Sequence, residues 1–226
     1  MEISGRTDHR LLPLLPAGLR MLDILSQDHT VVAAVLRQFC VFSPDLGAPE
    51  DAGDPVRLKK LEHLRILASV DPAWLYPIIQ HATKLNTLEL GGSYSRPGSG
   101  PTRDPIKYFE PATLPTTIRT VGMHQFRWSN KLSYHTPYTG RPFLEWVAKF
   151  PVVPETIACY PQHFEAAGET VLALVRMEGV KTIFQDCLRG PLRDEALQEA
   201  ERRGVVIHHT TKPYRPSPAF PWPNGE

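Results

Sequence analysis

Residues 85–90 read LNTLEL and residues 118–123 read IRTVGM, and both follow the pattern apolar-x-x-apolar-x-apolar. The alternation in the second half of each stretch is that of a β-strand, in which every second side chain faces the same side of a sheet. The pattern recurs, less regularly toward the C-terminus, at residues 19–24, 61–66, 154–159, 180–185 and 202–207. The sequence therefore predicts a succession of short strands.

Helices are predicted between these strands, because apolar residues there recur at intervals of three and four. The predicted helices cover residues 30–39, 72–83, 142–150, 165–178 and 193–203. Gly179 and Gly204 follow the last two of them, and glycine is the residue expected just after a helix. Strands that alternate with helices pair in parallel through crossover connections, so the predicted fold class is α/β.

The central apolar residue of each pattern predicts the strand register. These residues are Leu22, Leu64, Leu88, Val121, Ile157, Ile183 and Val205. Their separations run from 22 residues, between Ile183 and Val205, to 42, between Leu22 and Leu64. Leucine-rich repeats have about 20 to 29 residues, so the predicted architecture is an irregular leucine-rich-repeat-like solenoid with parallel strands alternating with helices.

Two columns of side chains follow from this register. The first consists of Thr87, Thr120, Thr156 and Thr182, and we expect it to be exposed. The second consists of Asp23, Arg65, Glu89, Gly122, Ala158, Phe184 and Val206, and it changes from charged to apolar along the stack. An exposed apolar end would be typical of a groove that binds a partner, and cover by the C-terminal tail is an equal alternative.

Composition narrows the possible partners and compartments. The 25 basic and 24 acidic side chains nearly cancel, which disfavours nucleic-acid binding. No stretch approaches the roughly 18 apolar residues of a membrane span, and we expect a soluble protein of the cytoplasm or nucleus. The cysteines, Cys40, Cys159 and Cys187, lack the spacing of a zinc site and are expected to be reduced core thiols.

The stretches LPAGLRMLDI, KLNTLEL and LPTTIRTVGM resemble the C-terminal leucine-rich-repeat-like region of fungal F-box proteins. The resemblance covers roughly residues 13–209 and implies a curved surface that holds a protein substrate. The asparagine or cysteine that regularly follows a repeat strand is missing, since the corresponding positions are Gln27, Ser69, Ser93, Phe126, Gln162, Leu188 and Thr210. No F-box-like helical module is found before Leu15, so docking to a ubiquitin-ligase adaptor is not predicted.

The predicted domain spans residues 1–226, with insertions at 91–117 and 127–141 and a proline-rich tail at 211–226. The second insertion mixes Trp128 and Tyr134 with basic residues, a composition typical of protein interfaces, although an ordered structural loop is a close alternative. The tail is expected to cap the last unit rather than to serve as a polyproline ligand.

The predicted function is a protein-protein interaction module. Its expected partner-binding residues are Arg119, His124, Trp128, Tyr134, Tyr160, Phe184, Asp186 and His208. Among these, Arg119, His124, Tyr160 and Phe184 are expected to be exposed and adjacent. No catalytic residue, metal or cofactor is predicted, because the familiar nucleophile and nucleotide-binding motifs are absent. Oligomeric state is left open.

An α/β enzyme of unrecognised class is the alternative hypothesis. It places His124, Asp186 and His208 in one column at the carboxyl ends of the strands, where open α/β sheets bind ligands. Two histidines and a carboxylate could bind a metal, or could act as acid and base beside Tyr160. The three side chains would then converge in one cleft.

Overall fold

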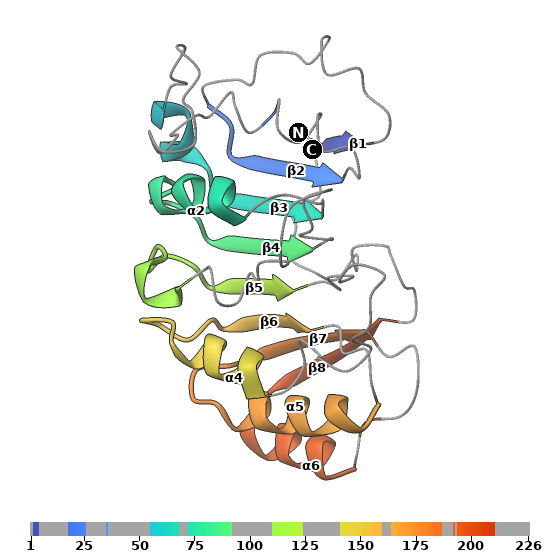
Figure 1. The fold of residues 1–226 in the computed structure, drawn as a ribbon. Helices are drawn as coiled ribbons and strands as arrows, with labels where there is room; N and C mark the ends of the chain where they lie inside the picture. The colour runs from blue at the N-terminus through green and yellow to red at the C-terminus, as the bar shows by residue number, and fades with distance from the viewer. Residues whose placement is uncertain are drawn as a thin grey trace, which may run out of the picture.

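A computed structural model of the chain describes residues 2–4, 18–25, 35, 55–67, 72–91, 110–123, 141–159, 164–186, 192 and 194–210. Within these ranges, eight strands form one parallel sheet in the order of the sequence (Figure 1). The strands are β1 Glu2–Ser4, β2 Met21–Leu25, β3 His63–Leu67, β4 Thr87–Gly91, β5 Thr120–Met123, β6 Thr156–Cys159, β7 Thr182–Asp186 and β8 Val206–Thr210. The predicted α/β class is therefore confirmed, and the sheet is open, with β1 and β8 at its edges.

Helices connect the strands close to where the sequence predicts them. They are α2 Pro72–His81, α4 Arg141–Ala148, α5 Phe164–Arg176 and α6 Asp194–Arg203, and short 3-10 helices lie at η3 Pro55–Lys60 and η4 Pro111–Thr113. Of the helix predicted at residues 30–39, the structure describes Val35, which is helical and buried. No helix in the described ranges is long and apolar enough to cross a membrane.

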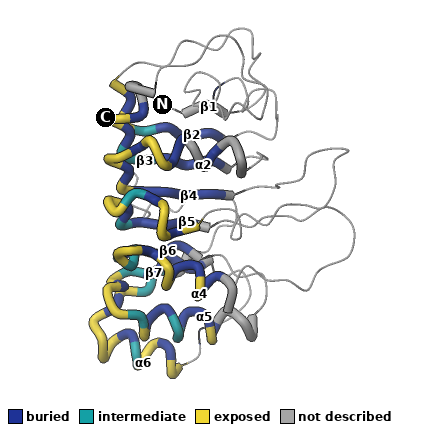
Figure 2. Tube along the Cα trace, turned by 60° about the vertical axis from the view of Figure 1, so that its left-hand side comes forward, coloured by how far each residue is buried: buried dark blue, intermediate teal, exposed yellow. Residues whose placement is uncertain are grey.

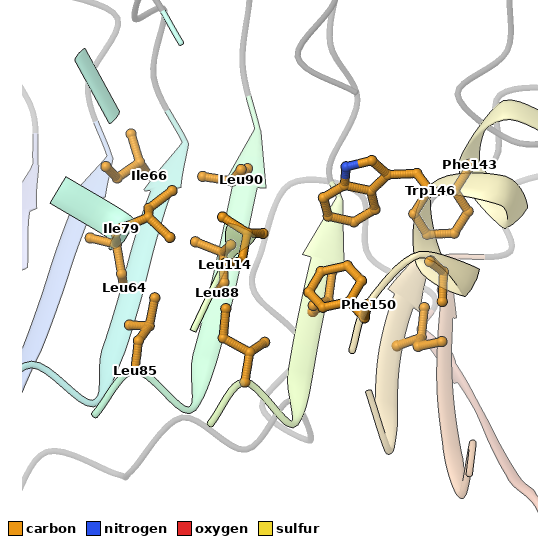
Figure 3. Packing of buried hydrophobic residues seen from close by; sticks show 14 of the residues in the cluster. Leu64, Ile66, Ile79, Leu85, Leu88, Leu90, Leu114, Phe143, Trp146 and Phe150 are labelled. Atoms are coloured by element: carbon orange, nitrogen blue, oxygen red, sulfur yellow. The ribbon is translucent and has the colours of Figure 1, made fainter. Parts of the chain in front are cut away.

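One face of the sheet packs against the helices. The alternate strand residues Leu64, Leu88 and Ile183 are at most 1% exposed and share one apolar cluster with Ile79 of α2 and Trp146 of α4. Figure 3 shows Leu64 and Ile66 of β3 lying beside Leu88 and Leu90 of β4, with Ile79 of α2 next to them. Burial of apolar area on this scale is the main stabilising contribution to such a fold.

Aromatic side chains fill the cluster around α4. The Trp146 ring meets Phe150 edge to face, with centroids 4.9 Å apart, and stacks toward Phe143 at 6.3 Å (Figure 3). All three side chains are at most 6% exposed. The helix prediction for residues 142–150 therefore identified a segment that the core holds in place.

The predicted threonine column is confirmed in register: Thr87 lies beside Thr120, then come Thr156 and Thr182. The backbone hydrogen bonds between β5 and β6 begin one residue before Thr120, since the N–H of Thr156 donates to the Arg119 carbonyl at 3.0 Å. The expectation of exposure is wrong for Thr87 and Thr120, which are 1% and 5% exposed.

The register predicted for the last strand is wrong by two residues. β8 begins at Val206, so Ile207 lies beside Ile183 and His208 beside Phe184, positions that the sequence assigned to Val205 and Val206. Three consecutive apolar residues, 205–207, carry no alternation and hence no register. Helix α6 continues to Arg203, and Gly204, at φ +69°, makes the turn into the strand.

The structure adds a strand that the sequence did not predict and places both ends of the first predicted insertion. β1 was not predicted, because three residues are too short to show a period; it places Ile3 beside Ile24. Gly91, at the start of the first predicted insertion, closes β4, and Leu114 near its end is buried in the core. Residues 92–109, 127–140 and 211–226 lie outside the described ranges.

Candidate protein-binding face

The sheet face opposite the helices carries the column that sequence reasoning singled out. In register across β2 to β8 it reads Asp23, Arg65, Glu89, Gly122, Ala158, Phe184 and His208. The predicted change from charged through small to apolar is confirmed for the first six positions. The seventh is His208, because of the shifted register of β8.

Three charged side chains at the β2–β4 end of this column form a buried network. Arg65 donates from Nε to Asp23 Oδ1 at 2.7 Å and from Nη2 to Asp23 Oδ2. Glu89 Oε2 lies 3.9 Å from Arg65 Nε, and the three side chains are at most 7% exposed. Charges removed from water need such partners, so this end of the column is an internal ion-paired cluster and not an accessible binding surface.

Gly122 makes room for the Glu89 side chain. A Cβ built at Gly122 would lie 2.8 Å from Glu89 Cγ and 3.5 Å from the Cβ of Ala158. The carboxylate side chain therefore crosses the glycine, and any larger residue there would displace it. A close approach of this kind explains why the column changes from charged to small at β5.

The aromatic end of the column is a stack. The rings of Phe184 and His208 lie 4.6 Å apart between centroids, with 12° between their planes. Phe184 is 3% exposed, so the expectation that it forms an exposed contact residue is wrong, whereas His208 is half-buried. Neighbouring parallel strands bring the two rings face to face, and the outer ring covers the inner one.

The proposed His/Asp/His column is not in register. Asp186 lies beside Thr210, and His208 lies two residues earlier on β8, beside Phe184. His124, Trp128, Tyr134 and Tyr160 lie outside the described ranges. Within those ranges, no group of three or more histidine, cysteine or acidic side chains is placed to hold a metal ion.

Arg119 lies ahead of β5, in a row of residues that precede the strands. Its Nη1 donates to the carbonyl oxygens of Thr116 at 2.7 Å and Ile118 at 3.2 Å, so the guanidinium is held by its own turn. β6 separates its strand from that of Phe184, and the two residues lie at different levels of the sheet. The predicted adjacency of Arg119 and Phe184 is therefore wrong.

The same row contains two exposed ion pairs. Arg20 contacts Glu62 through two hydrogen bonds, of 3.0 and 2.7 Å, and Lys181 donates to Glu155 at 2.8 Å. Hydrogen bonding to Lys181 lowers the pKa of Glu155, and hydrogen bonding to Arg20 lowers that of Glu62. These turns ahead of the strands are coloured exposed or intermediate in Figure 2, beside buried strand interiors.

His63 is a titratable group that sequence reasoning missed. It lies beside Met21 and Thr87 in register. Partial burial lowers its pKa, Glu62 raises it by a smaller amount, and Arg20 lowers it. A neutral imidazole at this position fits the uncharged threonine column that follows it.

Access to the strand face increases toward β8. Thr156, Thr182 and His208 are half-buried and Val206 is 51% exposed, whereas Thr87 and Thr120 are buried. We refer to Thr156, Thr182, Val206 and His208 as the C-terminal strand face. The threonine periodicity pointed to two of its members, but their exposure depends on the whole fold.

Comparison with protein families, with curated proteins and with solved structures finds no match to this chain.

Proposed function

We propose that the chain is a protein-binding module and that the C-terminal strand face is its contact surface. The carrying observation is that Thr156, Thr182, Val206 and His208 are half-buried or exposed, although Ala158 and Phe184 of the same face are buried. The central parts of protein interfaces are depleted of charged residues and contain apolar and aromatic groups. This surface fits such a contact, and the buried Asp23–Arg65 end does not.

A leucine-rich-repeat-like architecture is part of the same proposal. Each described strand pairs with the one before it, and each interior unit adds a strand and the chain that leads to the next, as in a leucine-rich-repeat-like solenoid. Such stacks bind proteins along the exposed residues of their strands. The resemblance of residues 13–209 to the repeat region of F-box proteins supports the same function, with a protein of the cytoplasm or nucleus as partner.

The ion pair between Glu155 and Lys181 borders this surface. Both side chains are substantially exposed, at 43% and 68%, and they neutralise each other. The rim is therefore polar while the middle is uncharged, which is the usual arrangement of a transient protein interface. We expect the partner to present a largely uncharged surface of similar size.

The test is affinity capture from the native cell with the full chain. A Thr156→Arg/Thr182→Arg double variant places two charges in the middle of the surface and should release the partner. The matched control is Thr83→Arg/Thr116→Arg, which makes the same change at two exposed threonines ahead of the strands.

A protein retained by the wild type and the control, but lost from the face variant, supports the proposed surface. Equal retention by all three chains would show that the contact lies elsewhere. Circular dichroism of each variant verifies that the fold is intact, so that loss of binding is not loss of structure.

A further inference from the structure

The turns that lead into β3 and β4 carry an excess of basic side chains. Lys59 and Lys60 end η3, just before β3, and Lys84 lies between α2 and β4; all three are exposed. Figure 1 shows these turns following one another along the side of the sheet where the strands begin. Among residues 55–62 and 82–86, which the structure describes, the one acidic residue is Glu62. This region is therefore positive, although basic and acidic side chains nearly cancel over the whole chain.

The register of β3 and β4 brings two of these lysines to neighbouring positions. Leu64 of β3 lies beside Leu88 of β4. Lys60 and Lys84 each precede one of these leucines by four residues, so they occupy equivalent positions in the two turns. Backbone hydrogen bonding between the two chains begins two residues before the leucines, at 2.8 Å. Adjacent strands lie about 4.8 Å apart, so the two lysine side chains start from turns at about this spacing.

Glu62 does not neutralise the three lysines. Its carboxylate accepts two hydrogen bonds from Arg20, of 3.0 and 2.7 Å. The hydrogen bond to Arg20 lowers the pKa of Glu62 most, and the charge of Lys84 lowers it further, as expected of a nearby cation. No described carboxylate forms an ion pair with Lys59, Lys60 or Lys84. Neighbouring like charges repel one another, so an anion that comes between them is favoured.

Lysines in the turns ahead of β6 and β7 differ in this respect. Lys149 Nζ lies 3.8 Å from a carboxylate oxygen of Glu110. Lys181 Nζ lies 2.8 Å from a carboxylate oxygen of Glu155. The lysines that have no carboxylate partner among the described residues are therefore concentrated ahead of β3 and β4, and do not follow the whole edge of the sheet.

We propose that Lys59, Lys60 and Lys84, which we call the lysine patch, bind an acidic peptide segment of another protein. Carboxylates that follow one another along an extended peptide can contact lysines of neighbouring turns, because lysine side chains are long and flexible. Exposed Thr83 and Asn86 lie beside Lys84 in the sequence and add hydrogen-bond donors. The chemistry of the lysine patch therefore fits a segment rich in aspartate and glutamate.

The backbone that carries the lysine patch is held in place. The N–H of Leu61 donates to the Leu58 carbonyl at 3.0 Å. The N–H of Leu85 donates to the Ala82 carbonyl at 2.8 Å, and the Thr117 hydroxyl donates to the Leu85 carbonyl at 2.6 Å. The three leucines are fully buried. Binding would thus order lysine side chains and ligand but not the turns, which limits the entropic cost of association.

An acidic peptide fits the lysine patch better than a nucleic acid does. Proteins that bind single strands combine a basic groove with aromatic side chains on which the bases stack. Among the described residues the exposed large apolar side chains are Val152, Leu197 and Val206, and none of them is aromatic. Proteins that bind duplexes commonly neutralise about six to ten phosphates, more than three lysines can.

This inference does not rest on the proposed function. The lysine patch lies in the turns ahead of β3 and β4, whereas the C-terminal strand face belongs to β6, β7 and β8. A loss of binding at one surface therefore leaves the other intact, and the two proposals can fail separately.

The experiment is fluorescence anisotropy of the purified full chain with a labelled peptide of alternating glutamate and serine. We expect the wild type to bind this peptide but not its glutamine–serine counterpart, and to bind more weakly as salt rises, because the contacts are exposed charges. Lys60→Gln/Lys84→Gln should weaken binding about tenfold at low salt. The matched control, Lys149→Gln/Lys181→Gln, removes the same charge from the turns ahead of β6 and β7 and should leave the affinity unchanged.

Three outcomes would overturn the proposal. The first is a wild-type chain that does not bind the acidic peptide at low salt. The second is an equal loss in the two double variants, since net charge and not the lysine patch would then govern binding. The third is tighter binding of an oligothymidylate of equal charge that is lost in Lys60→Gln/Lys84→Gln, which would assign the patch to nucleic acid. Thermal unfolding verifies that each variant is folded.

Discussion

Arg65 is the central residue of the buried charged cluster at the β2 to β4 end of the strand face. Its guanidinium contacts a carboxylate on the preceding strand and lies near another on the following strand, Asp23 and Glu89. The pair joins residues 42 positions apart in the sequence. Such a cluster contributes to stability only while all its members are present, because an unpaired buried charge is costly.

We therefore expect Arg65→Met to lower the free energy of unfolding by about 3–5 kcal/mol, since it leaves Asp23 buried without its partner. Urea unfolding of the full chain, followed by circular dichroism, measures the change. A double variant, Asp23→Leu/Arg65→Met, should recover part of the loss.

The control for this prediction is Arg20→Met. It breaks the Arg20–Glu62 pair, in which the arginine side chain is 71% exposed, and water replaces the lost contact. Its effect should be much smaller than that of Arg65→Met. Equal effects would mean that burial of the Asp23–Arg65 pair does not govern its contribution.

At the scale of elements, the junctions after α5 and α6 place each following strand. Gly179 and Gly204 have φ angles of +95° and +69°, in the left-handed region that favours glycine. α6 ends at Arg203 and β8 starts at Val206, so the turn at Gly204 directly positions the edge strand. Its backbone conformation matters more than its space, because a Cβ there would meet no atom within 4 Å.

Gly204→Ala should lower the free energy of unfolding by about 1–2 kcal/mol, the cost of a left-handed conformation at a residue with a Cβ. Gly204→Asn should cost less, since asparagine adopts that conformation more readily. Guanidinium unfolding compares the two. Gly18→Ala is the control, because Gly18 has open space and no positive φ; a loss as large as that at Gly204 would rule out this explanation.

At the scale of the molecule, an open sheet with strands in sequence order has interior strands and edge strands of unequal stability. β4, β5 and β6 pair on both sides, whereas β8 pairs with β7 alone among the described elements. Local opening therefore costs less at β8 than in the interior.

Hydrogen exchange measured by mass spectrometry on the full chain should show this difference. The amides of β4 to β6 are expected to exchange at least about tenfold more slowly than those of β8. A tenfold difference corresponds to about 1.4 kcal/mol in the free energy of local opening. Uniform protection across the sheet would mean that the chain opens only as a whole and that its edges are not weaker.

Several features could be predicted from the sequence because they depend on neighbouring residues. Alternation at residues 85–90 and 118–123 identified strands, three-and-four spacing identified α2, α4, α5 and α6, and Gly179 and Gly204 marked helix ends. The threonine register was also predictable, because the threonine precedes the central apolar residue in each of four units.

Other features depended on contacts between distant residues. The run at 205–207 is apolar throughout, so only the pairing of β8 with β7, which sets Ile207 beside Ile183, decided the register of β8. The burial of Phe184 depends on His208, which lies 24 positions later and stacks on its ring. The predicted binding residues therefore included a buried one, and they did not include Thr156, Thr182 and Val206, which are half-buried or exposed on the same face.

The sequence by itself determined the α/β class, the order of helices and strands and the column of residues on the strand face, because periodicity and turn residues act over a few positions. Only the tertiary structure decided which part of that column meets solvent. Burial depends on what the rest of the chain places over each residue, and local sequence does not encode that. For the same reason, the buried Asp23–Arg65–Glu89 end of the column follows only from the folded chain.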